Sequence, residues 1–320
     1  MDQQLIITQH HAEKFSLYNG DCLDVLANMP DNCIDMSVFS PPFVDLFCYS
    51  SSERDFGNCV DYAAFFVKFD LLCAQLFRVL KPGRIVAVHC IDIPAMKERD
   101  GYIGLKDFPG DIIKSFQKAG MIYHNRTTIW KDPLIEATRT KAIGLMHKQL
   151  CKDSTMARCG LPDYLLAFRM PGENVQRVTH PDGLSEYFGA KDPGLTGEKR
   201  SHNIWRAYAS PVWMDVRQTR MIPHRKAREE KDEKHLCPLQ LDTIARALTL
   251  WSNPGDAVLT PFLGVGSEVF QSVSMGRKAV GVELKAAYFK QAVLNCTAAA
   301  QGVAREEMPL FGDVQLGEDE

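Results

Sequence analysis

The sequence predicts an α/β protein whose mainly parallel sheet carries helices on both faces. Strand and helix patterns alternate in two parts of the chain, residues 15–130 and 239–297, and this alternation is typical of a parallel sheet. In each part an apolar strand pattern ends in a turn of proline or glycine, and α/β proteins bind ligands at such strand ends. The 320 residues are 45% hydrophobic, enough for a sizeable core in one large domain with an insertion, or in two domains.

The first part predicts strands and helices in turn. Strands are expected at residues 15–19, 34–39, 84–89 and 121–130, and helices at residues 22–29, 62–80 and 109–119. The stretch Lys81-Pro82-Gly83 is expected to end the second helix, because proline lacks an N–H group and glycine favours turns.

The second part returns to regular alternation. Helices are expected at residues 239–251, 267–275 and 285–297, and strands at residues 257–260 and 278–282. Between the two parts, residues 133–230 have weak periodicity and are rich in Gly, Pro, Arg and Lys. A long insertion of this kind inside an α/β domain usually serves function. Residues 305–320 are acidic and are expected to fray.

The net charge of −3 conceals an uneven distribution. Residues 124–236 contain 20 Lys and Arg against 14 Asp and Glu, whereas the remainder contains 17 against 26. A basic segment within an acidic protein suits a surface that faces a polyanion. A solvated loop region with incidental Lys and Arg residues explains the charge equally well.

Composition favours a cytoplasmic protein without a membrane partner. The first residues lack the basic-then-apolar pattern of a signal peptide, and no apolar run reaches membrane-spanning length. The ten cysteines lie mostly in apolar contexts and are expected to be reduced. One set of residues has side chains that could bind a metal ion: His147, Cys151, Cys159, His235 and Cys237. Their spacing is irregular and lacks a paired C-x-x-C, so we expect no metal.

Ser40, Pro41, Pro42 and Phe43 form a rigid turn at the end of the strand expected at residues 34–39. Each proline fixes its own φ, and Pro42 also keeps Pro41 out of the helical region. The turn therefore presents carbonyl acceptors beside an aromatic ring, which suits it to hold a flat, amino-bearing ring by its edge and its face. A rigid surface turn without a ligand is the alternative.

A glycine loop and an acidic strand end indicate a nucleoside-bearing cofactor. Gly264 and Gly266 follow the strand expected at residues 257–260, and Glu283 ends the next strand. Small residues let the backbone approach a ligand at a helix N-terminus, and a carboxylate at the second strand end can accept ribose hydroxyls. Val269 stands where dinucleotide-binding loops have a third glycine, so S-adenosylmethionine fits better than a nicotinamide cofactor. Glu283 as a plain surface residue is the alternative.

These residues resemble the DNA amino-methyltransferases, which methylate N4 of cytosine or N6 of adenine. The family's [S/N/D]-P-P-[Y/F/W] and F-x-G-x-G motifs match residues 40–43 and 262–266. The catalytic motif comes first and the basic insertion lies between the two, which resembles the beta-type order. The resemblance implies a Rossmann-like, S-adenosylmethionine-dependent methyltransferase sheet with an inserted target-recognition region. The implied division is a catalytic half (1–132), the recognition insertion (133–232), a cofactor-binding half (233–304) and an acidic tail (305–320).

Four further segments resemble family motifs in the same order: residues 19–22, 77–83, 128–131 and 233–238. The resemblance implies that the cofactor is bound by Asp21, Cys22, His235, Pro261, Phe262, Gly264, Gly266, Ser267 and Glu283. Two positions depart from the family pattern. Thr260 stands where many members have Asp, so the acceptor for the charged end of the cofactor is weaker there or lies elsewhere. Leu236 stands where the family's E-K-H-P segment has its proline.

The resemblance implies methyl transfer to the exocyclic amino group of a base flipped out of double-stranded DNA. The Pro41 carbonyl and the Ser40 hydroxyl would accept the amino hydrogens, and Phe43 would stack on the base. Direct displacement needs no covalent intermediate and no metal, and the absence of any Pro-Cys pair argues against cytosine C5 chemistry. Serine at the first motif position favours cytosine N4 over adenine N6.

Several alternatives stay open at this stage. A methyltransferase of the same fold acting on RNA or on a protein amide, and a non-catalytic DNA-binding relative, share these patterns. Phosphate contacts or a solvated helix would both explain a basic run of residues: Arg217, Arg220, Arg225, Lys226 and Arg228. We expect a stand-alone modification enzyme without an obligate protein partner. Such an enzyme would be the methylating component of a restriction-modification system. Family members often pair, so a homodimer is compatible with the resemblance.

Overall fold

The computed structural model describes residues 8–43, 54–134, 136, 147–224 and 238–304, and its centre is a nine-stranded sheet. The strand order is β1-β2-β11-β10-β3-β4-β8-β7-β9. The five strands from β2 to β4 are parallel to one another, whereas β8 runs antiparallel to both β4 and β7. The expected α/β class with a mainly parallel sheet is confirmed.

The first part of the chain supplies β2 (Phe15–Asn19), α1 (Cys22–Ala27), β3 (Ile34–Phe39), α2 (Tyr62–Val79), β4 (Leu80–Cys90), α4 (Phe108–Lys118) and β7 (Ile122–Ile129). The three helices share one start signal. Asp21, Asp61 and Asp107 each accept a backbone N–H of the first helical turn, at 2.9, 2.7 and 2.9 Å. Such caps satisfy N–H groups that have no partner inside the helix.

The predicted end of the second helix before Lys81-Pro82-Gly83 is confirmed, because α2 ends at Val79. The strand expected from residue 84 begins earlier, since β4 starts at Leu80 and includes these three residues. The pairing of β3 with β4 shifts register between Ile34 and Met36, so the strand absorbs the irregular residues as a bulge. Gly83 adopts a φ of 73°, which favours glycine, and its N–H donates to the Pro171 carbonyl.

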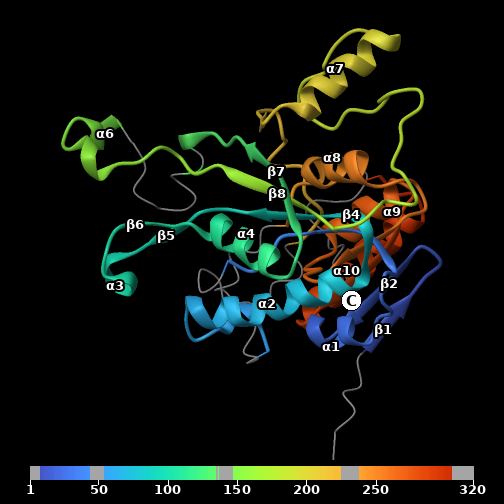
Figure 1. Ribbon diagram of the computed structural model, residues 1–320. Coiled ribbons are helices and arrows are strands. Elements are labelled where there is room, and N and C mark those ends of the chain that lie inside the picture. The colour runs from blue at the N-terminus through green and yellow to red at the C-terminus, as the bar shows by residue number, and fades with distance from the viewer. Residues whose placement is uncertain (1–7, 44–53, 135, 137–146, 225–237, 305–320) are drawn as a thin grey trace, which may run out of the picture.

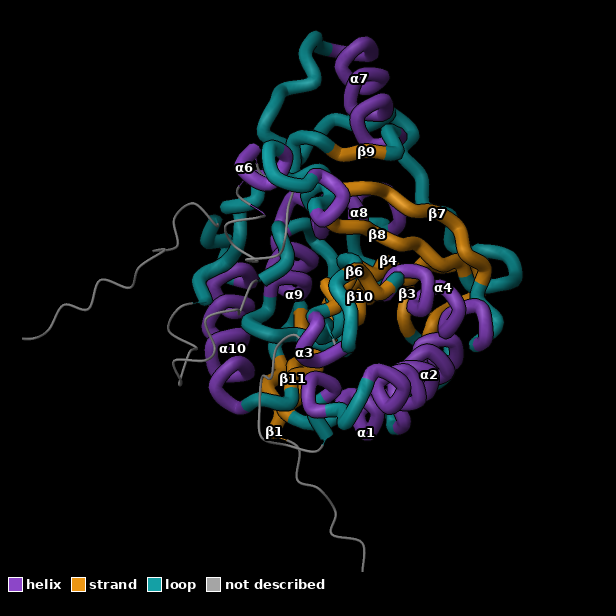
Figure 2. Tube along the Cα trace, turned by 90° about the vertical axis from the view of Figure 1, so that its left-hand side faces the viewer, coloured by secondary structure: helices purple, strands orange, loops and turns teal. Residues whose placement is uncertain are grey.

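The second part supplies α8 (Leu241–Trp251), β10 (Ala257–Thr260), α9 (Ser267–Ser274), β11 (Lys278–Glu283) and α10 (Ala286–Ala300). These elements agree with the prediction to within a few residues. Figures 1 and 2 show the layers: α1, α2 and α4 lie on one face of the sheet, and α8, α9 and α10 on the other. Each face buries its own apolar cluster, so both faces of the central strands are covered.

Shorter helices and strands complete the described structure. They are β1 (Thr8–His11), β5 (Ile93–Ala95), α3 (Lys97–Asp100), β6 (Gly104–Lys106), α6 (His147–Leu150), α7 (Gly197–Ala209), β9 (Val212–Trp213), and the helical turns η2 (Phe56–Asn58) and η3 (Ser154–Met156). In both views α7 lies at the top of the molecule, away from the sheet (Figures 1 and 2).

Two strands, β8 and β9, lie unpredicted in the stretch expected to be irregular. β8 (Asp163–Arg169) lies inside the sheet between β4 and β7, and five of its seven residues are buried. Its short apolar run does not alternate, and periodicity alone cannot tell such a run from a buried helix segment. Because β8 is antiparallel, its first residue, Asp163, reaches the end of the sheet where β3 and β4 finish.

Buried ion pairs tie the two parts of the chain together at the opposite end of the sheet. The Arg84 guanidinium donates to Asp35 at 2.9 Å and to Asp256 at 3.0 Å, and all three side chains are buried. These residues lie near the starts of β4, β3 and β10, so the carboxyl ends of the parallel strands are left for a ligand.

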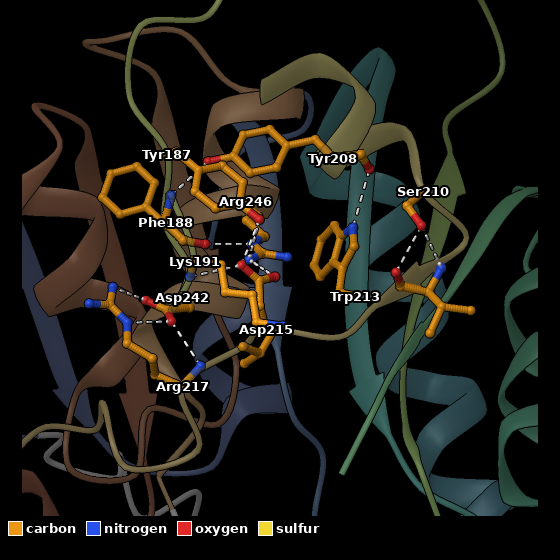
Figure 3. Close-up of polar contacts among 12 residues, drawn as sticks. Tyr187, Phe188, Lys191, Tyr208, Ser210, Trp213, Asp215, Arg217, Asp242 and Arg246 are labelled. Atoms are coloured by element: carbon orange, nitrogen blue, oxygen red, sulfur yellow. Dashed lines mark hydrogen bonds and ion pairs between the residues drawn. The ribbon is translucent and has the colours of Figure 1, made fainter. Parts of the chain in front are cut away.

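A second anchor holds residues 187–215 against α8 (Figure 3). The fully buried Arg246 guanidinium lies 5.0 Å from the ring centres of Tyr187 and Trp213. It also donates to Asp215 at 2.7 Å and to the Phe188 carbonyl at 2.6 Å. The aromatic faces and the carboxylate compensate the buried charge, so α7 extends from a fixed base.

Among the described residues, no helix is both long and apolar enough to span a membrane.

Candidate functional site

A cavity of about 180 Å³ lies at the carboxyl ends of β2, β11, β10 and β3. One water needs only about 10–15 Å³ on the same kind of measure, so the cavity has room for an organic ligand. Its lining unites residues from both parts of the chain that sequence analysis selected: Asp21, Cys22, Ser40, Pro41, Pro42, Phe43, Pro261, Phe262, Gly264, Ser267 and Glu283. The two motifs, more than 200 residues apart, therefore form one site.

The glycine loop is held in shape by Glu283. The Gly264 N–H donates to Oε2 of Glu283 and the Lys285 N–H donates to Oε1, both at 2.8 Å. Burial raises the pKa of Glu283 to about 7, and these two donors oppose the rise. Each carboxylate oxygen has a second acceptor site, so hydroxyl groups of a ligand could still bind.

Gly266 has a different place from the one predicted. It is not part of the cavity lining; it caps α9 with a φ of 98°. A Cβ atom there would lie 3.0 Å from Cys296 Sγ and 3.3 Å from Ala292. Glycine is therefore required for the turn and for the approach of α9 to α10.

The Asp21 side of the cavity is fixed by bonds between the ends of β2 and β11. The Asn19 amide donates to the carbonyls of Glu283 and Leu284 at 2.7 and 3.0 Å, and the Gly20 N–H donates to the Glu283 carbonyl at 3.0 Å. Asp21 uses one carboxylate oxygen to cap α1. The ends of two parallel strands thus carry one carboxylate each into the same cavity.

Two features of this cavity have no clear sequence signal. Phe262 packs against Phe39 and Phe56, with ring centres 5.8 and 5.1 Å apart, so Phe56 completes an aromatic wall. Glu268, two residues after Gly266, is 5% exposed and also lines the cavity. Burial raises its pKa to about 8. Its position in the first turn of α9 is the only available hint.

The turn at residues 40–43 has a histidine partner that the sequence did not predict. Ser40 Oγ lies 3.1 Å from Nδ1 of His89, which is near the end of the neighbouring strand β4. The Phe43 ring lies 6.4 Å from the His89 ring and edge-on to Phe108 at 6.2 Å. His89 could have been suspected, because the strand that follows the catalytic strand in sequence pairs beside it.

His89 in turn contacts a buried acidic residue. Its Nε2 lies 3.1 Å from Oδ2 of Asp163, and Lys131 forms an ion pair with Oδ1. Burial alone would raise the pKa of Asp163, but the charges of His89 and Lys131 and their contacts hold it below its usual range. Asp163 has no sequence signal, because its strand is not predicted.

Two of the residues predicted to contact DNA, Arg217 and Arg220, form ion pairs within the protein. Arg217 donates to both carboxylate oxygens of the buried Asp242, at 2.9 and 2.7 Å, and Arg220 lies 3.4 Å from the same residue. These bonds fasten the segment to α8 (Figure 3). Arg225, Lys226 and Arg228, together with the predicted cofactor residue His235, lie outside the described residues.

Three of the residues considered as metal ligands, His147, Cys151 and Cys159, are described, whereas His235 and Cys237 lie outside the described residues. In the described part of the chain, no group of three or more His, Cys, Asp and Glu side chains is arranged to hold a metal ion. His147 and Cys151 contact each other at 3.8 Å on α6.

Comparisons with known proteins give a consistent result. A family model described as DNA methylase matches residues 34–294. The type II methyltransferase M.BamHI of Bacillus amyloliquefaciens is 27% identical over 84% of this chain, and M.BglII of Bacillus subtilis is 26% identical over 85%. The chain spans 54% of the length of the first relative and 66% of the second.

Solved structures share the fold. A Thermus thermophilus protein complexed with S-adenosyl-L-methionine has a TM-score of 0.61 and 23% identity, covering 91% of this chain and 96% of its own. The PvuII DNA methyltransferase, cytosine-N4-specific, has a TM-score of 0.61 and 14% identity, covering 89% and 86%. The expected Rossmann-like methyltransferase sheet is confirmed as the fold. With the family model matched over most of its length, the chain belongs to the DNA methylase family.

Proposed function

We propose that this protein transfers a methyl group from S-adenosylmethionine to an exocyclic amino group of a DNA base. The observation that carries the proposal is the meeting of residues 40–43 with the glycine loop in one cavity. A cofactor and an amino-bearing ring can lie side by side there, which is the arrangement that direct transfer requires.

The β10 and β11 side of the cavity suits the cofactor. Glu283 is placed to accept the ribose hydroxyls, Phe262 to pack against the adenine, and Asp21 to accept polar hydrogens of the nucleoside. When bound, S-adenosylmethionine supplies an electrophilic methyl group. The Thermus thermophilus relative in the fold carries this molecule, which supports the choice of cofactor.

In this proposal Glu268 supplies the carboxyl group that is missing at Thr260, a position where many family members have Asp. Thr260 is buried within β10, and its hydroxyl has no hydrogen-bond partner among the described residues. Glu268 lines the cavity instead. In our proposal its carboxyl is the local acceptor for the charged end of the cofactor.

The turn beside β3 suits the base. Ser40 and the Pro41 carbonyl accept the amino hydrogens, and Phe43 stacks on the ring of a flipped base. Acceptors held outside the ring plane favour a nitrogen with an available lone pair. Ser40, and the cytosine-N4-specific PvuII enzyme among the structures with this fold, support cytosine N4 over adenine N6.

Residues 133–232 form the target-recognition region in this proposal, apart from β8 and β9, which belong to the sheet. Helix α7 is its candidate reading element. Its exposed side chains include Lys199, His202, Trp205 and Arg206, and the three basic ones form no hydrogen bond or ion pair within the described part of the chain. Cationic and aromatic side chains on a projecting helix suit contact with phosphates and bases. The protein would act on double-stranded DNA in the cytoplasm, alone or as a homodimer, without an obligate protein partner.

The test is transfer of tritium from labelled S-adenosylmethionine to DNA. We expect incorporation by the wild type and loss of nearly all of it in Ser40→Ala/Phe43→Ala. Ser274→Ala, at an exposed position on α9, serves as the matched control and should retain full activity. Normal labelling of DNA by the double variant would show that the site is assigned wrongly.

The same assay separates the two rival functions. Label in RNA or in protein, with none in DNA, would replace the substrate class while keeping the chemistry. DNA binding without calorimetric binding of S-adenosylmethionine would instead indicate a non-catalytic relative.

A further inference from the structure

Three neighbouring strands bring Ser40, His89 and Asp163 into a line. Ser40 follows β3, His89 lies near the end of β4, and Asp163 begins the antiparallel β8. The contacts are Ser40 Oγ to His89 Nδ1 at 3.1 Å and His89 Nε2 to Asp163 Oδ2 at 3.1 Å. The line starts in the cavity and ends in the protein interior.

Burial increases along this line. Ser40 is half-buried, whereas His89 is 7% exposed and Asp163 is 1% exposed. A carboxylate as buried as Asp163 is costly unless it is paired, and Lys131 and His89 each face one of its oxygens. Lys131 satisfies one oxygen, so the other oxygen is free to orient the imidazole ring.

The wider surroundings of His89 add charges of both signs. Asp92 lies three residues after His89 in the sequence, and it accepts a hydrogen bond from the Tyr164 hydroxyl of β8 at 3.4 Å. Arg126 of β7 lies 5.2 Å from the Tyr164 ring centre. Together with Lys131 and Asp163, these groups give two acidic and two basic residues near the imidazole. None of the other charged groups directly contacts the ring atoms in the described structure, so Asp163 is its main electrostatic partner.

Methylation of an amino group creates a need for a proton acceptor. The nitrogen lone pair forms a bond to the methyl carbon, and the carbon–sulfur bond breaks with its electron pair left on sulfur. The nitrogen is then positively charged and must lose one proton. Ser40 alone is a poor destination, because a serine hydroxyl is neither a strong acid nor a strong base near neutral pH.

We propose that His89, oriented by Asp163, receives this proton through Ser40. As the nitrogen loses its proton to Ser40 Oγ, the hydroxyl proton of Ser40 passes to Nδ1 of His89. The imidazolium lies against the Asp163 carboxylate and later releases the proton to water. His89 is a positioning residue here, since it acts through Ser40. This inference rests on the proposed function and deepens it.

The arrangement requires one tautomer of His89. Nδ1 must be free of hydrogen to accept from Ser40, and Nε2 must carry the hydrogen that faces Asp163. The order serine, histidine, aspartate is that of enzymes that activate a hydroxyl group, but here the ring is reversed, with Nδ1 toward serine and Nε2 toward aspartate, and no covalent intermediate forms at Ser40.

The kinetic test measures single-turnover methyl transfer to DNA against pH. We expect the wild-type rate to depend on pH, as it does for reactions with a proton-transfer group. His89→Gln should lower the rate on the order of 10²–10⁴-fold, the range for such a group, and should change this dependence. Asp163→Asn should also lower the rate. His124→Gln, at an exposed position on β7, is the matched control and should leave both unchanged.

Binding of S-adenosylmethionine separates a proton role from damage to the fold. Calorimetric affinity should be the same in the wild type and in His89→Gln. If His89→Gln binds the cofactor and methylates DNA within about twofold of the wild type with the same pH profile, a margin far below the effect of a proton-transfer group, the inference is wrong while the proposed function stands. If the wild type methylates no DNA, both are overturned.

A measurement on the unreacted wild-type protein completes the test. Nitrogen-15 NMR of labelled histidine should identify His89 as the neutral Nε2–H tautomer at mildly alkaline pH. An Nδ1–H tautomer would overturn the inference, because Nδ1 could then only donate to Ser40.

Discussion

At the scale of single residues, two of the carboxyl groups that line the cavity, those of Glu283 and Glu268, have different tasks. Glu283 organises the glycine loop through two N–H donors, and Glu268 lines the same cavity from α9. Both have a raised pKa because burial disfavours the charged form. Their protonation therefore changes near neutral pH, where ordinary glutamate residues are already ionised.

The raised pKa of Glu283, about 7, predicts pH-dependent cofactor binding. Its ionised form is the better acceptor for ribose hydroxyls, so affinity for S-adenosylmethionine should fall as pH drops from above this value to below it. Glu283→Gln should weaken binding roughly 10-fold or more, since a hydrogen bond to a charged group contributes about 1.5–3 kcal/mol. Calorimetry at several pH values measures both effects. Equal affinity of wild type and variant at alkaline pH would rule out this role.

The raised pKa of Glu268 predicts that this residue makes the free energy of unfolding fall with rising pH, whereas most carboxyl groups make it rise. Its folded pKa, about 8, lies above its ordinary value of 4.5, so between these values the folded state binds more protons than the unfolded state. The free energy of unfolding should therefore decrease as pH rises through this window. Urea unfolding of wild type and Glu268→Gln should show a shallower decrease in the variant. Parallel pH profiles for the two proteins would contradict the assignment.

At the scale of elements, the strands and helices of both α/β parts are predictable from the sequence because their periodicity is strong. Lys81-Pro82-Gly83 marks the end of α2 correctly but hides the early start of β4, since a register shift of β4 against β3 absorbs those residues. β8 escapes prediction because its apolar run does not alternate, and periodicity alone cannot tell such a run from a buried helix segment. Without β8, Asp163 has no assigned place, and the contact between His89 and Asp163 cannot be predicted. Ser40–Phe43 and the glycine loop are recognisable because their function depends on local backbone shape.

The anchor at Arg246 predicts how α7 is held. Removing the buried guanidinium in Arg246→Met leaves Asp215 without its cation, and such losses destabilise by about 3–5 kcal/mol. We expect faster hydrogen exchange in residues 187–215 and weaker DNA binding, while cofactor affinity remains close to that of the wild type. Mass-spectrometric hydrogen exchange measures the first effect. Unchanged exchange in this segment would show that Arg246 does not fix it.

At the scale of the whole molecule, the chain interleaves its two parts in one sheet. β3 of the first part lies between β10 of the second part and β4 of the first. Buried ion pairs secure one end of these strands, and the cavity occupies the other. Residues 40–43 and the glycine loop meet because β3 and β10 are neighbours. The resemblance implies this proximity, but the spacing of the two motifs in the sequence does not.

Arg84 should therefore contribute to stability and not to chemistry. Arg84→Met leaves Asp35 and Asp256 buried with one partner fewer, and should lower the free energy of unfolding by about 3–5 kcal/mol. Lys118→Met, at the exposed pair with Asp70, is the matched control and should cost about 0–1 kcal/mol. Chemical denaturation measures both. Methyl transfer per folded molecule should be unchanged in each variant, and a selective loss in Arg84→Met would contradict this separation.

The most direct test of the central claim is nucleoside analysis of DNA incubated with the protein and S-adenosylmethionine carrying a deuterated methyl group. We expect deuterated N4-methylcytosine in the wild-type digest and none with Ser40→Ala/Phe43→Ala. Deuterated N6-methyladenine would keep the amino-methylation mechanism and change only the base. Deuterated 5-methylcytosine, or no labelled DNA nucleoside at all, would contradict the account.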